Sequence, residues 1–161
     1  HQKEGRLKEA EQLYREILRS NPDNVDAVRL LGNVTMQTGR IYEAERLFRR
    51  AVGKAPDFTL ARIDLAHALK KQSRLQEAID QCEQVIKLEP DNVQSHFLLG
   101  SNQSLAAKTY EAVEDNQRVL ELAPKHTGAM LGLGHVLKTV RRQEEAIEAY
   151  RKFIRLKPYT G

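Results

Sequence analysis

Apolar residues recur along the chain at helical spacing, in runs that short polar stretches separate. Residues 24–57 carry two such stripes, Val28, Leu31, Val34 and Thr35, then Ala44, Leu47, Phe48 and Ala51. Spacings of three and four residues place each stripe on one face of an amphipathic helix. The pattern therefore predicts one helix at 7–20 and then four helix pairs. The pairs are expected at 24–37 and 41–54, 58–71 and 75–88, 92–105 and 109–122, and 126–139 and 143–156.

Five prolines divide this pattern at a constant interval of 34 residues, at Pro22, Pro56, Pro90, Pro124 and Pro158. Alanine stands twelve residues before each proline, at Ala10, Ala44, Ala78, Ala112 and Ala146, and glutamate directly precedes each alanine. Leucine stands twenty-five residues before each of the last four prolines, at Leu31, Leu65, Leu99 and Leu133, and a small residue follows it. The chain is therefore one unit repeated in phase.

These columns resemble the tetratricopeptide repeat (TPR) family over the whole chain. The family pattern W-x2-L-G-x2-Y…A-x3-F…P is met in the last repeat by Met130, Leu133, Gly134, Leu137, Ala146, Tyr150 and Pro158, without the opening tryptophan. The resemblance implies an all-α fold, a right-handed superhelical solenoid of antiparallel helix pairs. It implies one array over 1–161, with a partial repeat at 1–23 and full repeats at 24–57, 58–91, 92–125 and 126–161.

Each repeat contains a joint and a turn whose residues have separate physical roles. Proline ends the second helix of a pair, because it lacks an N–H and disfavours helical geometry in the preceding residue. The next residues, such as Asp91 or Asn92, can cap the following helix through a side-chain oxygen. Between paired helices, Gly5 and Gly39 can adopt the left-handed conformation. That column otherwise holds Ser73, Ala107 and Arg141. Those three turns are expected to be built differently or to be strained.

Composition narrows the class of protein. The 161 residues are 40% hydrophobic, 30% charged and 6% aromatic, as expected for a helix-rich soluble domain. The net charge is +4, but acids and bases alternate, as in EAERLFRRAVGK, which argues against nucleic-acid binding. No apolar run is long enough to span a membrane, and the first residues lack the apolar region of a signal peptide. One cysteine, Cys82, excludes an internal disulfide framework, and the expected setting is cytoplasmic.

The two ends of the chain cut through the repeat pattern. The first residue falls at the eleventh position of a repeat, and the last lies three residues after Pro158. Solenoids usually close with a capping element that has a polar outer face. The sequence is therefore expected to be a piece of a longer protein. Its exposed ends are expected to self-associate through the last helix, near Tyr150 and Phe153.

One column of the repeat holds two residues that could have a chemical role. Tyr14, Phe48 and Tyr150 occupy it, and Cys82 and Asn116 replace the aromatic residue in two repeats. A buried free cysteine behaves as a small hydrophobe, so Cys82 is expected to fill the core. Asn116 needs a polar partner there.

Other candidates for catalysis or metal binding are weak. His67 and His135 share the ninth position of the first helix but lie two repeats apart, roughly 20 Å, which is too far for one metal ion. Glu144 and Glu145 are expected on a solvated face. No HExxH, CxxC, Walker loop or serine nucleophile motif occurs. This segment is therefore predicted to be non-catalytic, with no cofactor and no metal.

The first helix of each pair is the better candidate for a functional surface. In the TPR family it lines the concave groove, at about its second, fifth, sixth, ninth, twelfth and thirteenth positions. The candidate groove residues are Arg29, Asn33, Ile63, Asp64, His67, Lys70, Lys71, Phe97, Ser101, Leu131, His135 and Lys138. Apolar Ile63, Phe97 and Leu131 all hold the fifth position, which favours a peptide groove over a merely solvated surface.

Two specialised branches of the family fit the columns poorly. Members that grip the C-terminal carboxylate of large cytosolic chaperones use Lys and Asn, then Asn, then Lys and Arg, in three successive first helices. Arg29 and Asn33 resemble the first pair, but Asp64 at the next position would repel a carboxylate, and Gln94 and Leu98 follow. The asparagine ladder of certain sugar-transferring enzymes also fails, because its column holds Leu30, Asp64, Leu98 and Gly132.

Three functions are left open. The phased array favours a non-catalytic scaffold that binds a peptide or a segment of a partner protein in its groove. The alternative is the interaction arm of a larger sulfotransferase-like or glycosyltransferase-like enzyme, since bacterial proteins of these kinds often begin with such arrays. The closing IRLKPYTG resembles the last repeat of such arms. The third is RNA or DNA binding along a basic face, which salt-dependent binding to mixed oligonucleotides would show.

Overall fold

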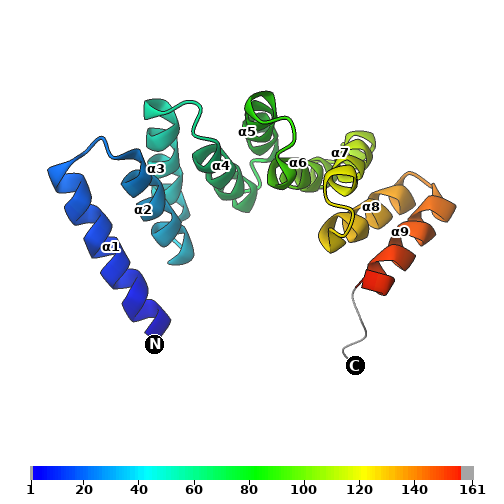
Figure 1. Ribbon diagram of the computed structural model, residues 1–161, viewed down its shortest axis with the longest axis horizontal. Coiled ribbons are helices and arrows are strands. Elements are labelled where there is room, and N and C mark those ends of the chain that lie inside the picture. Colours follow the sequence, from blue (N-terminus) through cyan, green and yellow to red (C-terminus); the bar gives the residue numbers. More distant parts are fainter. Residues whose placement is uncertain (1, 157–161) are drawn as a thin grey trace. The chain divides into compact units, whose positions relative to one another are not determined.

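The computed structural model describes residues 2–156, which form nine α-helices joined by short turns (Figure 1). The chain divides after Arg74 into two compact units. The first unit contains α1 Gln2–Ser20, α2 Val25–Gln37, α3 Ile41–Lys54 and α4 Thr59–Lys71. The second contains α5 Leu75–Leu88, α6 Val93–Leu105, α7 Thr109–Leu122, α8 Thr127–Thr139 and α9 Gln143–Leu156. Within each unit every helix packs against the next, and α2 also contacts α4 as α6 contacts α8.

The predicted helix pairs are confirmed to within one residue. The second helix of each pair begins and ends as predicted, and the first helix begins one residue later. The prediction for the leading helix is wrong at its start, because α1 begins at Gln2 and continues through Gly5. Gly5 is therefore helical and not in a left-handed turn. A glycine costs a helix only about 1 kcal/mol relative to alanine, and the strong helix formers around it continue α1. Pro158 lies outside the described residues.

Small residues let paired helices approach closely, as the sequence predicts. A Cβ added to Gly32 of α2 would lie 2.5 Å from Cε1 of Phe48 in α3, and Phe48 is 1% exposed. A Cβ added to Gly134 of α8 would lie 2.6 Å from Cε1 of Tyr150 in α9. In these pairs the aromatic ring fills the space that the glycine leaves, and a larger residue would force the helices apart.

The joints are capped by the second residue after the proline. Three caps accept a hydrogen bond from the N–H three residues on: Asn24 from Ala27 at 3.0 Å, Asn92 from Ser95 at 2.9 Å, and His126, through Nδ1, from Ala129 at 3.0 Å. The predicted cap at Asp91 or Asn92 is thus Asn92. Phe58 stands at the same position before α4 and has no side-chain cap bond. Its ring packs instead against the cluster of Val28, Ala51 and Ala61.

The turns between paired helices share one backbone conformation. Gly39 has a φ of 82°, and Ser73, Ala107 and Arg141 have φ values of 60°, 62° and 63°. The chain therefore keeps the same turn and accepts strain at the three non-glycine positions, where a Cβ costs roughly 1–2 kcal/mol. The turn is kept because its N–H groups bond the last carbonyls of the preceding helix. The N–H groups of Ala107 and Lys108 bond the carbonyls of Ser104 and Gln103 at 3.2 and 2.7 Å and so close the end of α6.

Candidate functional site

The first unit carries a polar surface on α2 and α4, which we call the α2–α4 surface: Arg29, Asn33, Asp64, His67 and Lys70. Asp64 links the two helices. Its Oδ2 accepts hydrogen bonds from Nη1 of Arg29 at 2.8 Å and from Nδ2 of Asn33 at 3.3 Å. The Arg29 and Asp64 side chains are only 20% and 19% exposed, so the pair is partly screened from water. Three sequence candidates are therefore brought together by one carboxylate.

Arg29 is also held from a second side. Its Cζ lies 5.8 Å from the centroid of the Phe58 ring, within reach of a cation–π contact. Its Nε is buried and has no hydrogen-bond partner. The side chain is therefore fixed by its neighbours before any ligand arrives, with one donor still unused.

The remaining candidates of the first unit lie at different depths. His67 is half-buried, and burial lowers the pKa of its imidazole; Lys70 and Lys71 lower it further, while Asp64 opposes the shift. Lys70 is half-buried and Lys71 is exposed. Ile63 is 1% exposed, so it belongs to the core of α4 and offers no surface to a peptide. Its apolar character reflects packing rather than a groove.

The second unit places its candidates on α6 and α8. Phe97 is half-buried, and its ring centroid lies 4.6 Å from that of His126 at an interplanar angle of 48°. Ser101 and Leu131 are also half-buried. Lys138 and His135 are exposed, and Nδ1 of His135 is 3.0 Å from the Tyr150 hydroxyl. This surface is less ionic than that of the first unit.

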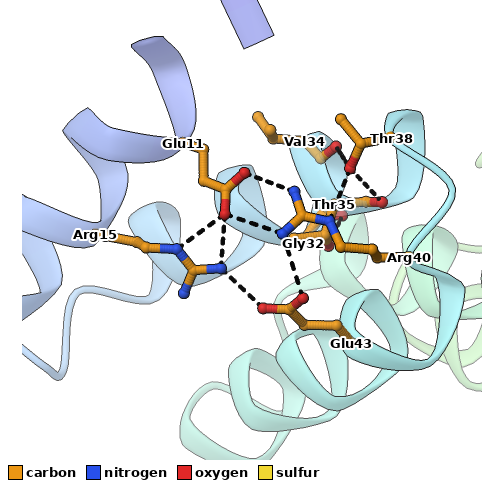
Figure 2. A network of polar contacts seen from close by, with 8 residues as sticks. All are labelled: Glu11, Arg15, Gly32, Val34, Thr35, Thr38, Arg40 and Glu43. Atoms are coloured by element: carbon orange, nitrogen blue, oxygen red, sulfur yellow. Dashed lines mark hydrogen bonds and ion pairs between the residues drawn. The ribbon is translucent and has the colours of Figure 1, made fainter. Parts of the chain in front are cut away.

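Sequence reasoning missed an ionic network that ties α1 to α3 (Figure 2). Glu11 accepts hydrogen bonds from Nη2 of Arg15 at 2.8 Å and from Nη1 of Arg40 at 3.0 Å. Glu43 accepts a second bond from Arg15 at 2.8 Å. The hydrogen bond from Arg40 is the largest influence on Glu11 and, with Arg15, lowers the pKa of its carboxyl to about 2, although partial burial opposes the shift. The four-residue spacing of Glu11 and Arg15 on one helix indicates an ion pair in the sequence, but their contacts with Arg40 and Glu43 are seen only in the structure.

A buried polar cluster in the second unit was also missed. His96 is 7% exposed. Its Nε2 donates to the carbonyl oxygen of Pro90 at 2.7 Å, and its Nδ1 lies 3.2 Å from Oδ1 of Asp115. Burial raises the pKa of the Asp115 carboxyl, and the bond to His96 opposes that shift. The cluster fastens the joint before α6 to α7.

In the column that holds Tyr14, Phe48 and Tyr150, which we call the aromatic column, the two exceptions are buried. Cys82 is 0% exposed, which confirms its place in the core. Asn116 is 3% exposed, and its Nδ2 donates to the carbonyl of Ala112 at 2.8 Å, so it finds its partner on its own helix. Glu144 and Glu145 are exposed.

Metal and membrane sites were sought in residues 2–156. In that range no group of three His, Cys, Asp or Glu side chains is placed to hold a metal ion. None of the described helices combines the length and the apolar character that crossing a membrane requires.

Solved structures with the same fold include the crystal structure of MamA, at 21% identity, a TM-score of 0.89, and coverage of 96% of this chain and 91% of that one. MamA from Desulfovibrio magneticus RS-1 is 19% identical, with a TM-score of 0.88 and coverage of 96% and 87%. YrrB, a TPR protein, is 21% identical, with a TM-score of 0.83 and coverage of 99% and 82%. At these identities the likeness establishes the fold. No curated protein matches the sequence.

Family models give the relationship itself. One tetratricopeptide repeat model matches residues 1–57 and 39–100, and a second matches residues 127–160. Together with the all-α helix pairs, these matches confirm the resemblance found in the columns. The chain belongs to the tetratricopeptide repeat family.

Proposed function

We propose that this segment is a protein-interaction scaffold that binds an extended segment of a partner protein along the first helices of its pairs. The α2–α4 surface carries the proposal, because Arg29, Asn33 and Asp64 are already held in one arrangement. Side chains that are ordered before binding lose little conformational entropy when a ligand arrives, and this favours affinity.

The charge of the surface suggests the character of the partner. Asp64 compensates Arg29, while Lys70 and Lys71 add positive charge at the end of α4. Complementary potentials favour an acidic segment there. In the second unit, the half-buried Phe97 and Leu131 would accept apolar side chains, with Ser101, His135 and Lys138 around them. YrrB, which has the same fold, is described as having an unusual peptide-binding site.

The test selects peptides from a random phage-displayed library against residues 1–161 and measures their dissociation constants by fluorescence anisotropy. The triple variant Arg29→Ala, His67→Ala, Lys70→Ala is expected to weaken selected acidic peptides by about tenfold or more, which corresponds to at least 1.4 kcal/mol. Circular dichroism checks that helicity is unchanged.

A control variant likewise removes one lysine and one arginine, but from exposed positions on α1 and α3. The variant Lys8→Ala, Arg46→Ala lies on second helices and should keep the affinity of the parent chain. If both variants bind equally well, or lose affinity equally, the α2–α4 surface is not the site.

The interaction arm of a larger enzyme stays a prediction, and the coding sequence that flanks this segment decides it. In that case too, the α2–α4 surface would serve binding and the reaction would take place in another domain. Nucleic acid is disfavoured by the ion pairing, since Arg15, Arg29 and Arg40 all bond to carboxylates. Absence of binding to mixed oligonucleotides at low salt would dismiss it.

A further inference from the structure

The first unit has a shallow hollow that lies outside the α2–α4 surface. Its volume is about 310 Å³, and side chains of the three consecutive helices α1, α2 and α3 line it. The lining residues are three leucines and three arginines: Leu18, Leu31, Leu47, Arg15, Arg19 and Arg50. We call this place the α1–α3 hollow, and it shares no residue with the α2–α4 surface.

The three leucines give the hollow an apolar floor that is already packed. Leu31 is 1% exposed, and Leu18 and Leu47 are half-buried. Leu18 and Leu47 also pack against the core cluster around Val28, so their positions are fixed by the fold. An apolar side chain laid on this floor leaves water without any rearrangement of the core, and this favours binding.

Two of the three arginines carry a charge that no carboxylate compensates directly. Arg15 bonds two carboxylates, which Figure 2 shows. Arg19 and Arg50 have no ion-pair partner among residues 2–156, and Nη2 of Arg50 donates at 2.6 Å to the neutral carbonyl oxygen of Pro22. The pKa of the exposed Asp23 is lowered mainly by its hydrogen bond from the last lysine of α3, and Arg50 adds only a weaker charge effect. The rim of the hollow is therefore open to an anionic partner.

The repeat itself does not require this combination of residues. The position of Leu31 holds leucine in every full repeat, whereas the three arginine positions change. In the later repeats they hold Arg49, Glu83 and Gln117, then Gly53, Lys87 and Glu121, and then Gln84, Arg118 and Lys152. Two repeats after Leu47, the same position holds Asp115. Three arginines around an apolar floor are therefore particular to the α1–α3 hollow.

We propose that the α1–α3 hollow binds an acidic segment of a partner protein. One aliphatic side chain of the segment lies on the three leucines, and carboxylates on either side of it bond Arg19 and Arg50. The guanidinium group suits this role, because its planar set of donors matches a carboxylate in two parallel hydrogen bonds. The scaffold then has a second binding surface, on its second helices, that acts independently of the α2–α4 surface.

The test is fluorescence anisotropy of residues 1–161 with a fluorescein-labelled peptide that carries one leucine between two pairs of aspartates. A dissociation constant below about 1 mM is expected, as for a short segment on a small surface. The variant Arg19→Ala, Arg50→Ala should weaken binding about tenfold or more. A peptide with glycine in place of the leucine should also bind more weakly, and one with asparagines in place of the aspartates should not bind.

The matched control is Lys87→Ala, Lys152→Ala, which changes the net charge by the same amount. Lys87 holds the position of Arg19 two repeats later, and Lys152 holds that of Arg50 in the last repeat. All four side chains are exposed. The control should bind the peptide like the parent chain, and so should the triple variant of the α2–α4 surface, which separates the two proposals.

Circular dichroism checks that the variants keep their helicity. If Arg19→Ala, Arg50→Ala lost helicity, Arg19→Gln alone would take its place, because it leaves the bond between Arg50 and Pro22 intact. No binding by the parent, equal losses in the arginine variant and its control, or unchanged binding of either altered peptide would overturn the proposal. Binding to phosphatidylglycerol vesicles but not to the peptide would also contradict it, and would assign the hollow to a membrane surface.

Discussion

The helix pairs α2–α3 and α6–α7 have the same lengths and the same turn but fill their interiors differently. In the first pair the Phe48 ring lies against Gly32. In the second, Asn116 lies against Gly100, with its Nδ2 3.0 Å from where a Cβ would stand. The repeat framework therefore depends on where small residues and turns fall. The side chain that fills the space can change from an aromatic ring to an amide.

The polar character of the second pair extends along α6. Buried polar residues on that helix are Ser95, His96, Asn102 and Gln103, whereas α2 buries only Thr35 among its polar residues. Thr35 donates to the Gly32 carbonyl at 2.8 Å. On α6, three side-chain oxygens, those of Ser95, Asn102 and Gln103, are buried without a partner, whereas α2 has one such atom, the Nε of Arg29. Such groups cost about 1–3 kcal/mol each, so we infer that α6–α7 is locally less stable than α2–α3.

Exchanging the residues of the aromatic column should have the largest effect. Phe48→Asn removes a buried ring and buries an amide in its place, and it should lower the free energy of unfolding by about 4 kcal/mol. Hydrogen exchange followed by mass spectrometry should show the loss in α2 and α3.

The reverse exchange, Asn116→Phe, should stabilise α6–α7 by about 1–2 kcal/mol, because it removes a buried amide and adds apolar area. Gly100 and Gly132, which have no side chains, flank Asn116. A loss of stability in this variant would show that the polar filling of α6–α7 is specific and not merely tolerated.

Substitution of the glycines that face this column should have the next largest effect, and its size should differ between the two pairs. Gly32→Ala forces a methyl group against the buried Phe48 ring and should cost about 2 kcal/mol. Gly100→Ala meets the tip of the Asn116 amide at 3.0 Å and should cost about half as much. Urea denaturation of both variants measures the difference, and equal costs would mean that the ring and the amide are equally rigid.

The sequence predicted the framework because its signals are local. Proline and the turn residues act on the backbone within a few residues and recur every 34 residues, so the ends of the paired helices were predicted to within one residue. The prediction was wrong where helix propensity or side-chain packing outweighs the local signal. Gly5 continues a helix because its neighbours are strong helix formers. Phe58 replaces a capping residue because its ring gains more from packing against Val28 and Ala61.

The candidate site was predicted less well, because periodicity tells which side of a helix a residue faces and not how deeply its neighbours cover it. Arg29, Ile63, Phe97 and Leu131 share the fifth position, yet Ile63 is buried while the other three are partly exposed. The partners of Arg29 and His96 are 35 and 19 residues away, and no sequence spacing indicates those contacts.

Acid should act with opposite sign on the α1–α3 ionic network and on the α6–α7 pair. In the folded chain the pKa of Glu11 lies at about 2, below its ordinary value of 4.5, so its contribution is present above pH 4.5 and is lost as the pH falls toward 2. Glu11→Gln should therefore cost about 1 kcal/mol at pH 7 and progressively less below pH 4.5. The pKa of Asp115 is raised, so protonation of Asp115 stabilises the folded state as the pH falls. In urea titrations at pH 7, Glu11→Gln should be less stable than the parent and Asp115→Asn more stable, and both differences should shrink as the pH falls. Differences that do not change with pH would contradict the assignment.

The smallest effect should come from the turns. Gly39 and Ala107 hold the same turn position, with φ values of 82° and 62°, but only Ala107 has a Cβ in the left-handed region. Ala107→Gly removes that strain and should stabilise α6–α7 by about 0.5–1 kcal/mol, reduced somewhat by the extra entropy of glycine in the unfolded chain. Gly39→Ala should destabilise α2–α3 by about 1 kcal/mol, although no atom lies within 4 Å of the added Cβ. Gly53→Ala is the matched control for the second change, because Gly53 is helical and equally open, and there alanine should stabilise. If Gly39→Ala and Gly53→Ala shift the thermal midpoint in the same direction, backbone strain does not distinguish these turns, and the difference between the two pairs rests on side-chain packing alone.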